Sequence, residues 1–239
     1  VVYVATLGYL RNGSLILLLL AGGSLAFSIG SLLAGWTIGS PNGPNVAVTI
    51  HNSGAFLSAI FHFMGAALVF FGATSVVRPK HLKITMGCVF LGVLALIAFV
   101  VAMTLYDLFP SFFIQGEGPT PFRQMILGST VFLFGMTPVL LMTFYFRSGA
   151  DFLYWYSIAL VFIAIGLSCI FFQRSVGSPI GWAGRAAQYL SGIYFLLAVL
   201  TAVKDVRTRG TALEESIADL FRHRLNPGTK TDRGAFQGQ

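Results

Sequence analysis

The stretch that decides the fold is SLILLLLAGGSLAFSIGSLLAGWTI, residues 14 to 38, which carries no Asp, Glu, Lys or Arg. A helix needs about 20 mostly apolar residues to cross the hydrocarbon core of a bilayer. Strands of a membrane barrel are instead about ten residues long and alternate apolar with polar residues, and the run Leu15–Leu20 shows no alternation. This stretch is therefore predicted to be a transmembrane helix.

Five further stretches of this kind follow along the chain, and together they set the fold class. Hydrophobic residues make up 56% of the sequence and charged residues 10%, with a mean hydropathy of +0.80. A water-soluble domain of 239 residues needs more charge than this to cover its surface. We predict an all-α polytopic membrane bundle with six full spans. They cover roughly Ser14–Ile38, Val46–Val76, Thr85–Tyr106, Phe122–Phe146, Phe152–Phe172 and Trp182–Val203.

The first ten residues, Val1–Leu10, are apolar but too few to cross a bilayer. At about 1.5 Å per residue, a helix of this length reaches only halfway. Two interpretations are open: an interfacial tail, or the second half of a first span whose start is missing. The sequence begins without an initiator Met, so we expect a fragment, which is compatible with the second interpretation.

The placement of Lys and Arg predicts the orientation. When the loops are numbered alternately after Leu10, eight cations fall in one set and three in the other. The first set holds Arg11, Arg78, Lys80, Lys83, Arg147, Lys204, Arg207 and Arg209, and the second holds Arg123, Arg174 and Arg185. By the positive-inside rule the first set and the C-terminus face the cytoplasm, across a prokaryotic inner membrane. Because Arg11 is then internal, we favour seven helices with an external N-terminus. The net charge of +7 is explained by cations facing anionic lipid and requires no nucleic acid.

Polar residues form one stripe along the second full span. His51, Gly54, Ser58, His62 and Gly65 share a narrow helix face. His51 is expected near the outer mouth and His62 near mid-membrane, about 16 Å apart along the axis. Polar side chains within a membrane mark functional sites by default, although both imidazoles could simply bond to neighbouring helices. The two histidines cannot bind one haem iron together, and no other span carries a partner histidine, so haem b with a single His or a His/Met pair stays open.

The other polar elements fall at the same predicted end. In the loop Gln115–Gln124, Glu117 and Arg123 are close enough in sequence to pair across a tight turn. In the last span, Trp182 suits an interfacial anchor, and Arg185 stands one turn inside the membrane. Such an Arg is costly unless it meets a carboxylate, a carbonyl or an anionic ligand, or unless it snorkels to the headgroups.

We predict one pocket between the second full span and the last span, roofed by the Gln115–Gln124 loop. Its ligand is expected to be a small hydrophobic or amphiphilic molecule, such as a quinone or a lipid-like compound, with His51 and Arg185 as polar anchors and Trp182 and Tyr189 as walls. No cofactor is required. The candidate ligand-binding residues are His51, Asn52, Ser58, His62, Glu117, Arg123, Trp182, Arg185, Gln188 and Tyr189.

Four segments resemble membrane-associated sensor (MASE-type) domains, which precede PAS and histidine-kinase modules in bacteria and archaea. They are YLRNGSLILLLLAGGSLAFSIGSLLAGW, TIHNSGAFLSAIFHFMGAAL, FFIQGEGPTPFRQMILG and GSPIGWAGRAAQYLSGIYFLLA. The resemblance covers roughly residues 1–205. It implies a transmembrane sensory input module that detects a membrane-soluble or extracytoplasmic cue and passes it to a cytoplasmic output domain, typically a histidine kinase. No kinase phosphoacceptor box or ATP lid stands in this sequence.

The residues after the last span suit a relay. We divide the chain into a sensor domain, residues 1–205, and a cytoplasmic linker and tail, residues 206–239. Leu213, Ile217, Leu220 and Phe221 recur at helical spacing and predict an amphipathic helix suited to homodimer pairing, although it could also pack on the inner loops. The polar residues beyond Gly228 are predicted to be disordered.

The motifs argue against catalysis. The sequence holds no HExxH, no GxSxG and no phosphate-binding Gly-Lys loop, and its acidic residues stand outside the middle of the spans. A sensory input module without enzymatic activity is therefore preferred. The alternatives are an electron-transfer membrane subunit that binds haem or a quinone, and a small transporter.

Overall fold

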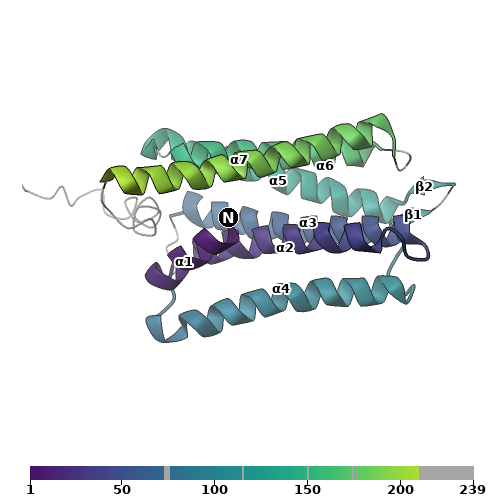
Figure 1. Cartoon of the computed structure of the whole chain (residues 1–239), viewed down its shortest axis with the longest axis horizontal. Coiled ribbons are helices and arrows are strands. Elements are labelled where there is room, and N and C mark those ends of the chain that lie inside the picture. Colours follow the sequence, from purple (N-terminus) through teal and green to yellow (C-terminus); the bar gives the residue numbers. More distant parts are fainter. Residues whose placement is uncertain (73–75, 115, 150, 174, 176, 210–239) are drawn as a thin grey trace, which may run out of the picture.

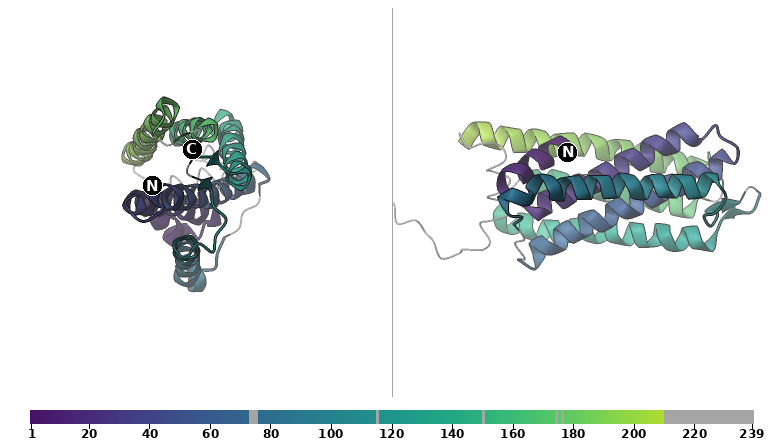
Figure 2. Two further views of the ribbon diagram at one scale, coloured as in Figure 1. Left: turned by 90° about the vertical axis from the view of Figure 1, so that its right-hand side faces the viewer. Right: turned by 90° about the horizontal axis from the view of Figure 1, so that it is seen from below.

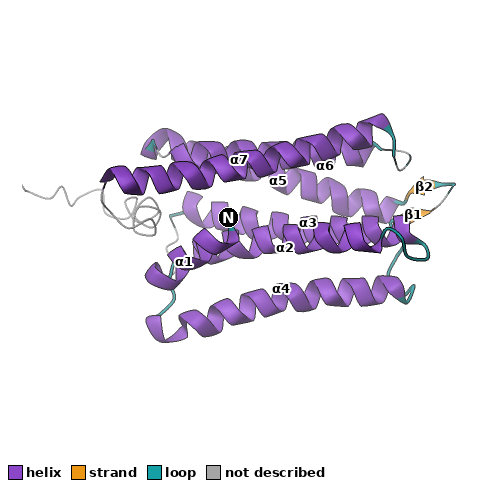
Figure 3. Ribbon diagram, in the orientation of Figure 1, coloured by secondary structure: helices purple, strands orange, loops and turns teal. Residues whose placement is uncertain are grey.

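The computed structural model describes residues 1–72, 76–114, 116–149, 151–173, 175 and 177–209. Over these residues the chain forms seven α-helices, one short 3-10 helix and a two-stranded hairpin (Figures 1 and 3). The predicted amphipathic segment around Leu213 and the polar tail after it lie outside the described residues. The elements are α1 (Val2–Asn12), α2 (Leu15–Thr37), α3 (Gly43–Phe70), η1 (Pro79–His81), α4 (Leu82–Leu105), β1 (Phe113–Ile114), β2 (Gly118–Pro119), α5 (Pro121–Ser148), α6 (Asp151–Phe172) and α7 (Pro179–Arg209).

The prediction of an all-α polytopic bundle is confirmed. Helices α2 to α7 are each long and apolar enough to cross a membrane. The limits shift by a few residues: α3 begins at Gly43 rather than Val46, because Pro44 fits the first turn of a helix, where no backbone N–H donor is needed. The same helix ends at Phe70 rather than Val76.

The long helices run alternately up and down, so the bundle has two distinct ends (Figure 1). One end, here called the basic end, carries Arg11, Arg78, Lys80, Lys83 and Lys204. The other, here called the hairpin end, is formed by residues 38–42, the segment 106–120 with its β-hairpin, and the start of α7. The two groups of loops assigned from the sequence therefore lie at opposite ends.

Helix α1 packs at the basic end and begins near the middle of the bundle (Figure 1). Tyr9 is fully buried, and its hydroxyl donates to the Leu82 carbonyl at 3.1 Å. The helix stops at Gly13, whose φ of 66° and close approach to the Val77 carbonyl leave no room for a side chain. The continuation of α1 into a full span stays a prediction.

Two helix pairs approach so closely that only glycine fits between their backbones. A Cβ on Gly30 of α2 would lie 3.0 Å from the Gly54 Cα of α3. A Cβ on Gly166 of α6 would lie 2.7 Å from the Gly184 carbonyl oxygen of α7. Small residues permit such contacts between membrane helices and increase their van der Waals packing.

Helix α4 is the least embedded of the long helices. Only Val93, Ile97 and Thr104 are buried along it. Its main contacts are with α2 and α3, and the end-on view places it on the side opposite α6 and α7 (Figure 2). Most of its surface therefore faces outward.

Candidate functional site

The hairpin end is held in place by side chains that bond to backbone. Asn45, in the first turn of α3, is 3% exposed, and its Oδ1 accepts from the Phe112 and Phe113 N–H groups at 2.9 and 3.0 Å. β1 then pairs antiparallel with β2. Thr120 caps α5 by accepting from the Arg123 N–H at 3.3 Å, and its own hydroxyl donates to the Ser111 carbonyl at 2.7 Å. These bonds fix the direction in which α5 enters the bundle.

Because α5 starts in this direction, the Arg123 side chain points into the protein. The residue is only 2% exposed, and its Nη2 donates to the Ile170 carbonyl near the C-terminal end of α6 at 2.8 Å. Carbonyls in the last turn of a helix lack intrahelical partners and attract cations. The adjacent Gln124 makes the equivalent bond to the Phe171 carbonyl at 3.2 Å. The Nε and Nη1 groups of Arg123 and the Oε1 of Gln124 are buried without a hydrogen-bond partner in the described structure.

The expected pairing of Glu117 with Arg123 is wrong. Glu117 is exposed in the turn of the hairpin, and the one side-chain hydrogen bond that the described structure gives Arg123 goes to Ile170. The physical reason is the Thr120 cap, because it starts the helix directly after the hairpin and turns Arg123 toward α6.

His51 of α3 and Arg185 of α7 lie within the range of an electrostatic interaction, and no hydrogen bond joins them in the described structure. The half-buried His51 ring has Nδ1 3.3 Å from the Ser31 Oγ of α2 and packs edge-on against Phe27. Its Nε2 is buried and lacks a hydrogen-bond partner among the residues described. The exposed Arg185 guanidinium lies 5.2 Å from the Trp182 ring centroid.

Two amides complete the polar residues of this half of the bundle. Asn52 of α3 is 1% exposed, and the half-buried Gln188 of α7 packs against Gly166 of α6. Within the described part of the chain, neither the Asn52 Nδ2 nor the Gln188 Nε2 has a hydrogen-bond partner. We call His51, Asn52, Arg123, Gln124 and Gln188, which stand in this half of α3, α5 and α7, the hairpin-end cluster; no hydrogen bond joins any two of them in the described structure.

His62 forms a separate polar site in the middle of the bundle. It is 1% exposed, and its Nδ1 lies 2.8 Å from the Ser58 carbonyl of the preceding turn. Its ring stacks on Tyr156 with centroids 6.1 Å apart and lies against Gly23, so that only glycine fits at that position. The His62 Nε2 and the Tyr156 hydroxyl, which faces Ser24 without bonding to it, are both buried with no hydrogen bond to any described residue. His51 and His62 therefore lie in different surroundings, although the sequence analysis placed both in one pocket.

The remaining predicted residues do not converge on one enclosed space. Trp182 is 60% exposed and Tyr189 is 73% exposed, so the described helices do not enclose either ring. β1 packs against α3, which brings part of the predicted roof over that helix. Among the described residues there is no group of three or more His, Cys, Asp or Glu side chains that could hold a metal ion.

Sequence reasoning missed several residues that shape this end. Gln124 stands beside Arg123 in the loop that was singled out, and an amide next to a membrane Arg was a usable signal. Asn45 lies one residue before the predicted start of its span, so it was taken as loop. Tyr156 carried no signal, because a tyrosine near the end of an apolar span is commonly an interfacial anchor.

The membrane-spanning part of the chain matches a known family. The family model for a membrane-associated sensor domain, MASE3, covers residues 1–205, which includes every described helix except the end of α7. No curated protein and no solved structure matches the chain. The family match agrees with the resemblance drawn from the four sequence segments and with the six candidate spans. The chain is a multi-pass membrane sensor domain and belongs to the MASE3 family of membrane-associated sensor domains.

Proposed function

We propose that this sensor domain binds a small-molecule cue at the hairpin-end cluster and relays the binding event along α7 to a cytoplasmic output domain. The cue is membrane-soluble or reaches the site from outside the cell. The observation that carries the proposal is a set of buried guanidinium and amide N–H donors without partners at the hairpin end; the unpaired groups elsewhere in the described structure are hydroxyls and the His62 ring nitrogen.

These unpaired donors indicate the chemistry of the cue. Arg123, Asn52 and Gln188 contribute N–H groups that lack acceptors in the described structure. The unpaired acceptor is the Gln124 Oε1, and the unpaired His51 Nε2 donates or accepts according to its tautomer. A buried polar group without a partner costs about 1–3 kcal/mol, and more when it is charged. A molecule with carbonyl or carboxylate oxygens and an apolar body would relieve that cost. A quinone or a lipid-like carboxylate has this character.

The relay follows from the continuity of α7. This helix has 31 residues and extends from the hairpin end to the basic end, a length of about 46 Å at about 1.5 Å per residue. Arg185 and Gln188 lie near its start, so a ligand held there would shift or rotate the helix that leads to the output. The segment Leu213–Phe221 beyond α7 would then pair two copies of the chain as a homodimer.

This direction of signalling requires the basic end to lie in the cytoplasm. The eight-to-three distribution of cations over the two sets of loops supports that orientation. Reporter fusions at Gly43, Lys80 and Gly210 should read outside, inside and inside. An external reading at Gly210 would reverse the topology and remove the proposed relay.

A second function has one specific observation in its favour. A histidine that binds haem iron through Nε2 commonly donates its other N–H to a backbone carbonyl, and His62 holds Nδ1 against Ser58 in this way. Gly23 lies against the ring and Tyr156 stacks on it, which disfavours haem at this position. A reduced-minus-oxidised visible spectrum of the purified chain decides the question: a haem b band that is absent from His62→Ala protein would favour an electron-transfer subunit.

The sensory proposal is tested by binding and by output. In lipid nanodiscs, a short-chain ubiquinone and octanoate are each added to the full chain, and the melting temperature is followed. At least one probe should raise the melting temperature of wild-type protein and of the matched variant Arg11→Gln, but not that of Arg123→Gln. Residues 1–225 fused to a histidine-kinase core should then respond to the same probe.

Two results would contradict the proposal. Equal shifts in Arg123→Gln and wild-type protein would remove the cluster as the binding site. An unresponsive fusion together with substrate flux in proteoliposomes would favour the transporter.

A further inference from the structure

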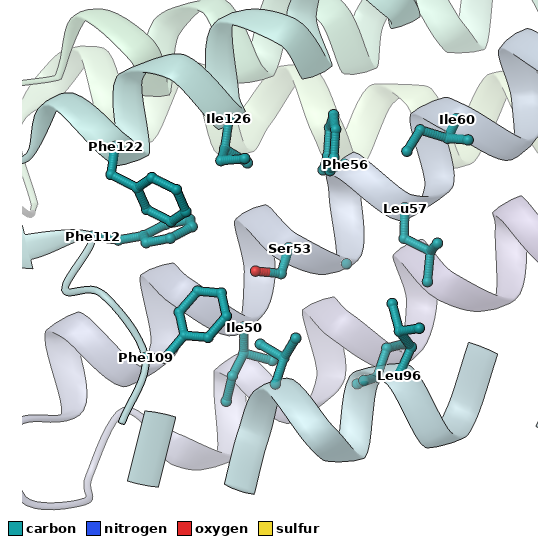
Figure 4. Close-up of a pocket in the computed structure, with 13 residues that line it drawn as sticks. Ile50, Ser53, Phe56, Leu57, Ile60, Leu96, Phe109, Phe112, Phe122 and Ile126 are labelled. Carbon is teal, nitrogen blue, oxygen red and sulfur yellow. The ribbon is translucent and has the colours of Figure 1, made fainter. Parts of the chain in front are cut away.

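A second, apolar site lies beside the polar one. Between α3, α4 and α5, close to the hairpin end, the structure forms a partly open cavity of about 220 Å³ (Figure 4). Its lining comes from these three helices and from the segment that precedes β1. Ser53 supplies the one hydroxyl among the lining side chains, and no charged side chain lines the cavity.

One wall of the cavity consists of three phenylalanine rings. Phe112 and Phe122 meet edge to face with centroids 5.5 Å apart, and Phe109 lies 6.0 and 6.2 Å from them (Figure 4). Such geometries stabilise aromatic clusters beyond simple contact. The Asn45 side chain fixes the backbone of this wall, because its Oδ1 accepts a hydrogen bond from the Phe112 N–H. The wall is therefore built into the fold rather than formed around a guest.

The opposite wall belongs to the helix that is packed most lightly. Leu96 of α4 lines the cavity and is 54% exposed, so the space reaches the outer surface of the bundle where the chain meets lipid. Ile97, one residue on, is buried against the core. An apolar molecule dissolved in the bilayer therefore has a route into the cavity past α4.

We propose that this cavity binds an uncharged, ring-sized apolar molecule that partitions into the bilayer. Size and polarity support this ligand class, because an apolar protein cavity of about 150 Å³ is large enough to bind benzene. The absence of charged side chains from the lining disfavours an ionic headgroup, and the aromatic wall suits a flat ring.

The site is distinct from the hairpin-end cluster but shares one helical turn with it. Ile50 and Ser53 of α3 line the cavity, whereas His51 and Asn52, between them in sequence, belong to the polar cluster. A ligand in the cavity would press on the same turn that carries two of the polar groups. The domain would thus respond to two chemically different molecules.

The test is photolabelling of the full chain in phosphatidylcholine nanodiscs with the apolar probe 3-trifluoromethyl-3-phenyldiazirine, with labelled residues mapped by mass spectrometry. Labelling at Phe109, Phe112 and Leu96 should saturate with probe concentration and fall when excess toluene is added. Labelling at Leu200, a lipid-facing residue of α7 that is 52% exposed, should rise linearly. Linear, uncompeted labelling at all four positions would mean that bulk acyl chains fill the cavity, and would overturn the proposal.

A matched pair of variants localises the signal. Ile126→Phe places extra volume in the cavity and should weaken the saturable labelling by about tenfold or more, because a filled cavity excludes the ring. Ile193→Phe makes the same change on the exposed face of α7 and should leave the saturable labelling unaltered. Unchanged labelling in folded Ile126→Phe protein would overturn the proposal. If that variant does not fold, Ser53→Leu takes its place with the same expectation.

Arg123→Gln separates this site from the polar one, because it removes the one guanidinium of the hairpin-end cluster, and Arg123 does not line the cavity. Saturable labelling should persist in this variant. If it is lost there, the two sites are one, and the proposal of a separate apolar site fails.

Discussion

The two ends of the bundle differ in the kind of buried polar group that is left without a partner. At the basic end the Tyr9 hydroxyl is satisfied by a carbonyl, Leu18, Phe144 and Leu153 belong to the same apolar core, and the unpaired groups are small hydroxyls such as Thr6 Oγ1 and Ser157 Oγ. At the hairpin end, the unpaired groups are the guanidinium of Arg123 and the amide of Asn52. The comparison suggests a division of labour, in which the basic end supplies stability and the hairpin end keeps polar groups available for a ligand.

The largest effect is expected where the basic end is packed most tightly. Leu153→Ala removes a side chain that is 1% exposed and should lower the free energy of unfolding by about 2–4 kcal/mol, because the cavity is only partly filled by relaxation. SDS titration in mixed micelles measures this change. Leu200→Ala, at a lipid-facing position, is the control and should have little effect. Equal losses in both variants would show that the basic end is not a stabilising core.

At the hairpin end, substitution of Arg123 is not expected to lower the free energy of unfolding. Arg123→Met replaces a buried guanidinium that has two N–H groups without acceptors, and should leave the free energy of unfolding unchanged or raise it by about 1–3 kcal/mol. The same titration checks it in ligand-free protein. A loss as large as that of Leu153→Ala would break the comparison, since Arg123 would then be structural.

A smaller effect should follow from loosening the hairpin. Asn45→Ala removes the acceptor for two backbone N–H groups and should cost about 1–2 kcal/mol. Hydrogen exchange at the Phe112 and Phe113 amides should quicken, while exchange in α6 stays as it was. Asn45→Asp keeps the acceptor oxygen and should restore slow exchange. If it does not, the two hydrogen bonds to Asn45 are not what holds this loop.

The smallest effect concerns a satisfied group at the basic end. Tyr9→Phe removes the hydroxyl that donates to the Leu82 carbonyl and should lower the free energy of unfolding by about 0.5–1.5 kcal/mol. This value is the reference for a paired polar group in this protein. A stabilising result would mean that paired and unpaired groups do not differ here.

Much of the fold could be predicted from the sequence, because hydropathy along a membrane chain depends on local composition. Six stretches of sufficient length sufficed for six spans, and the opening run Val1–Leu10 became α1. The limits were less accurate where Pro and Gly stand in the first turn, as at Gly43 and Pro44. The four quoted segments were enough to indicate the family.

The site was harder to predict, because its geometry depends on contacts between distant residues. Asn45 and Phe112 are 67 residues apart, and no local pattern marks them as partners. Charge alone suggested Glu117 as the partner of Arg123, whereas helix capping turned that arginine toward α6. The apolar cavity could not be predicted from the sequence, since apolar residues such as Phe122 and Ile126 occur both in filled cores and in the lining of cavities.

The glycine contacts described for two helix pairs also bear on how the domain moves. Where Gly30 meets Gly54, and Gly166 meets Gly184, the backbones touch and side chains cannot slide between them. Each pair, α2 with α3 and α6 with α7, is therefore expected to behave as a single stiff lever. Rearrangement is therefore expected at the interfaces of α5 with α3 and with α6. The hydrogen bond from Arg123 to the Ile170 carbonyl crosses the interface with α6.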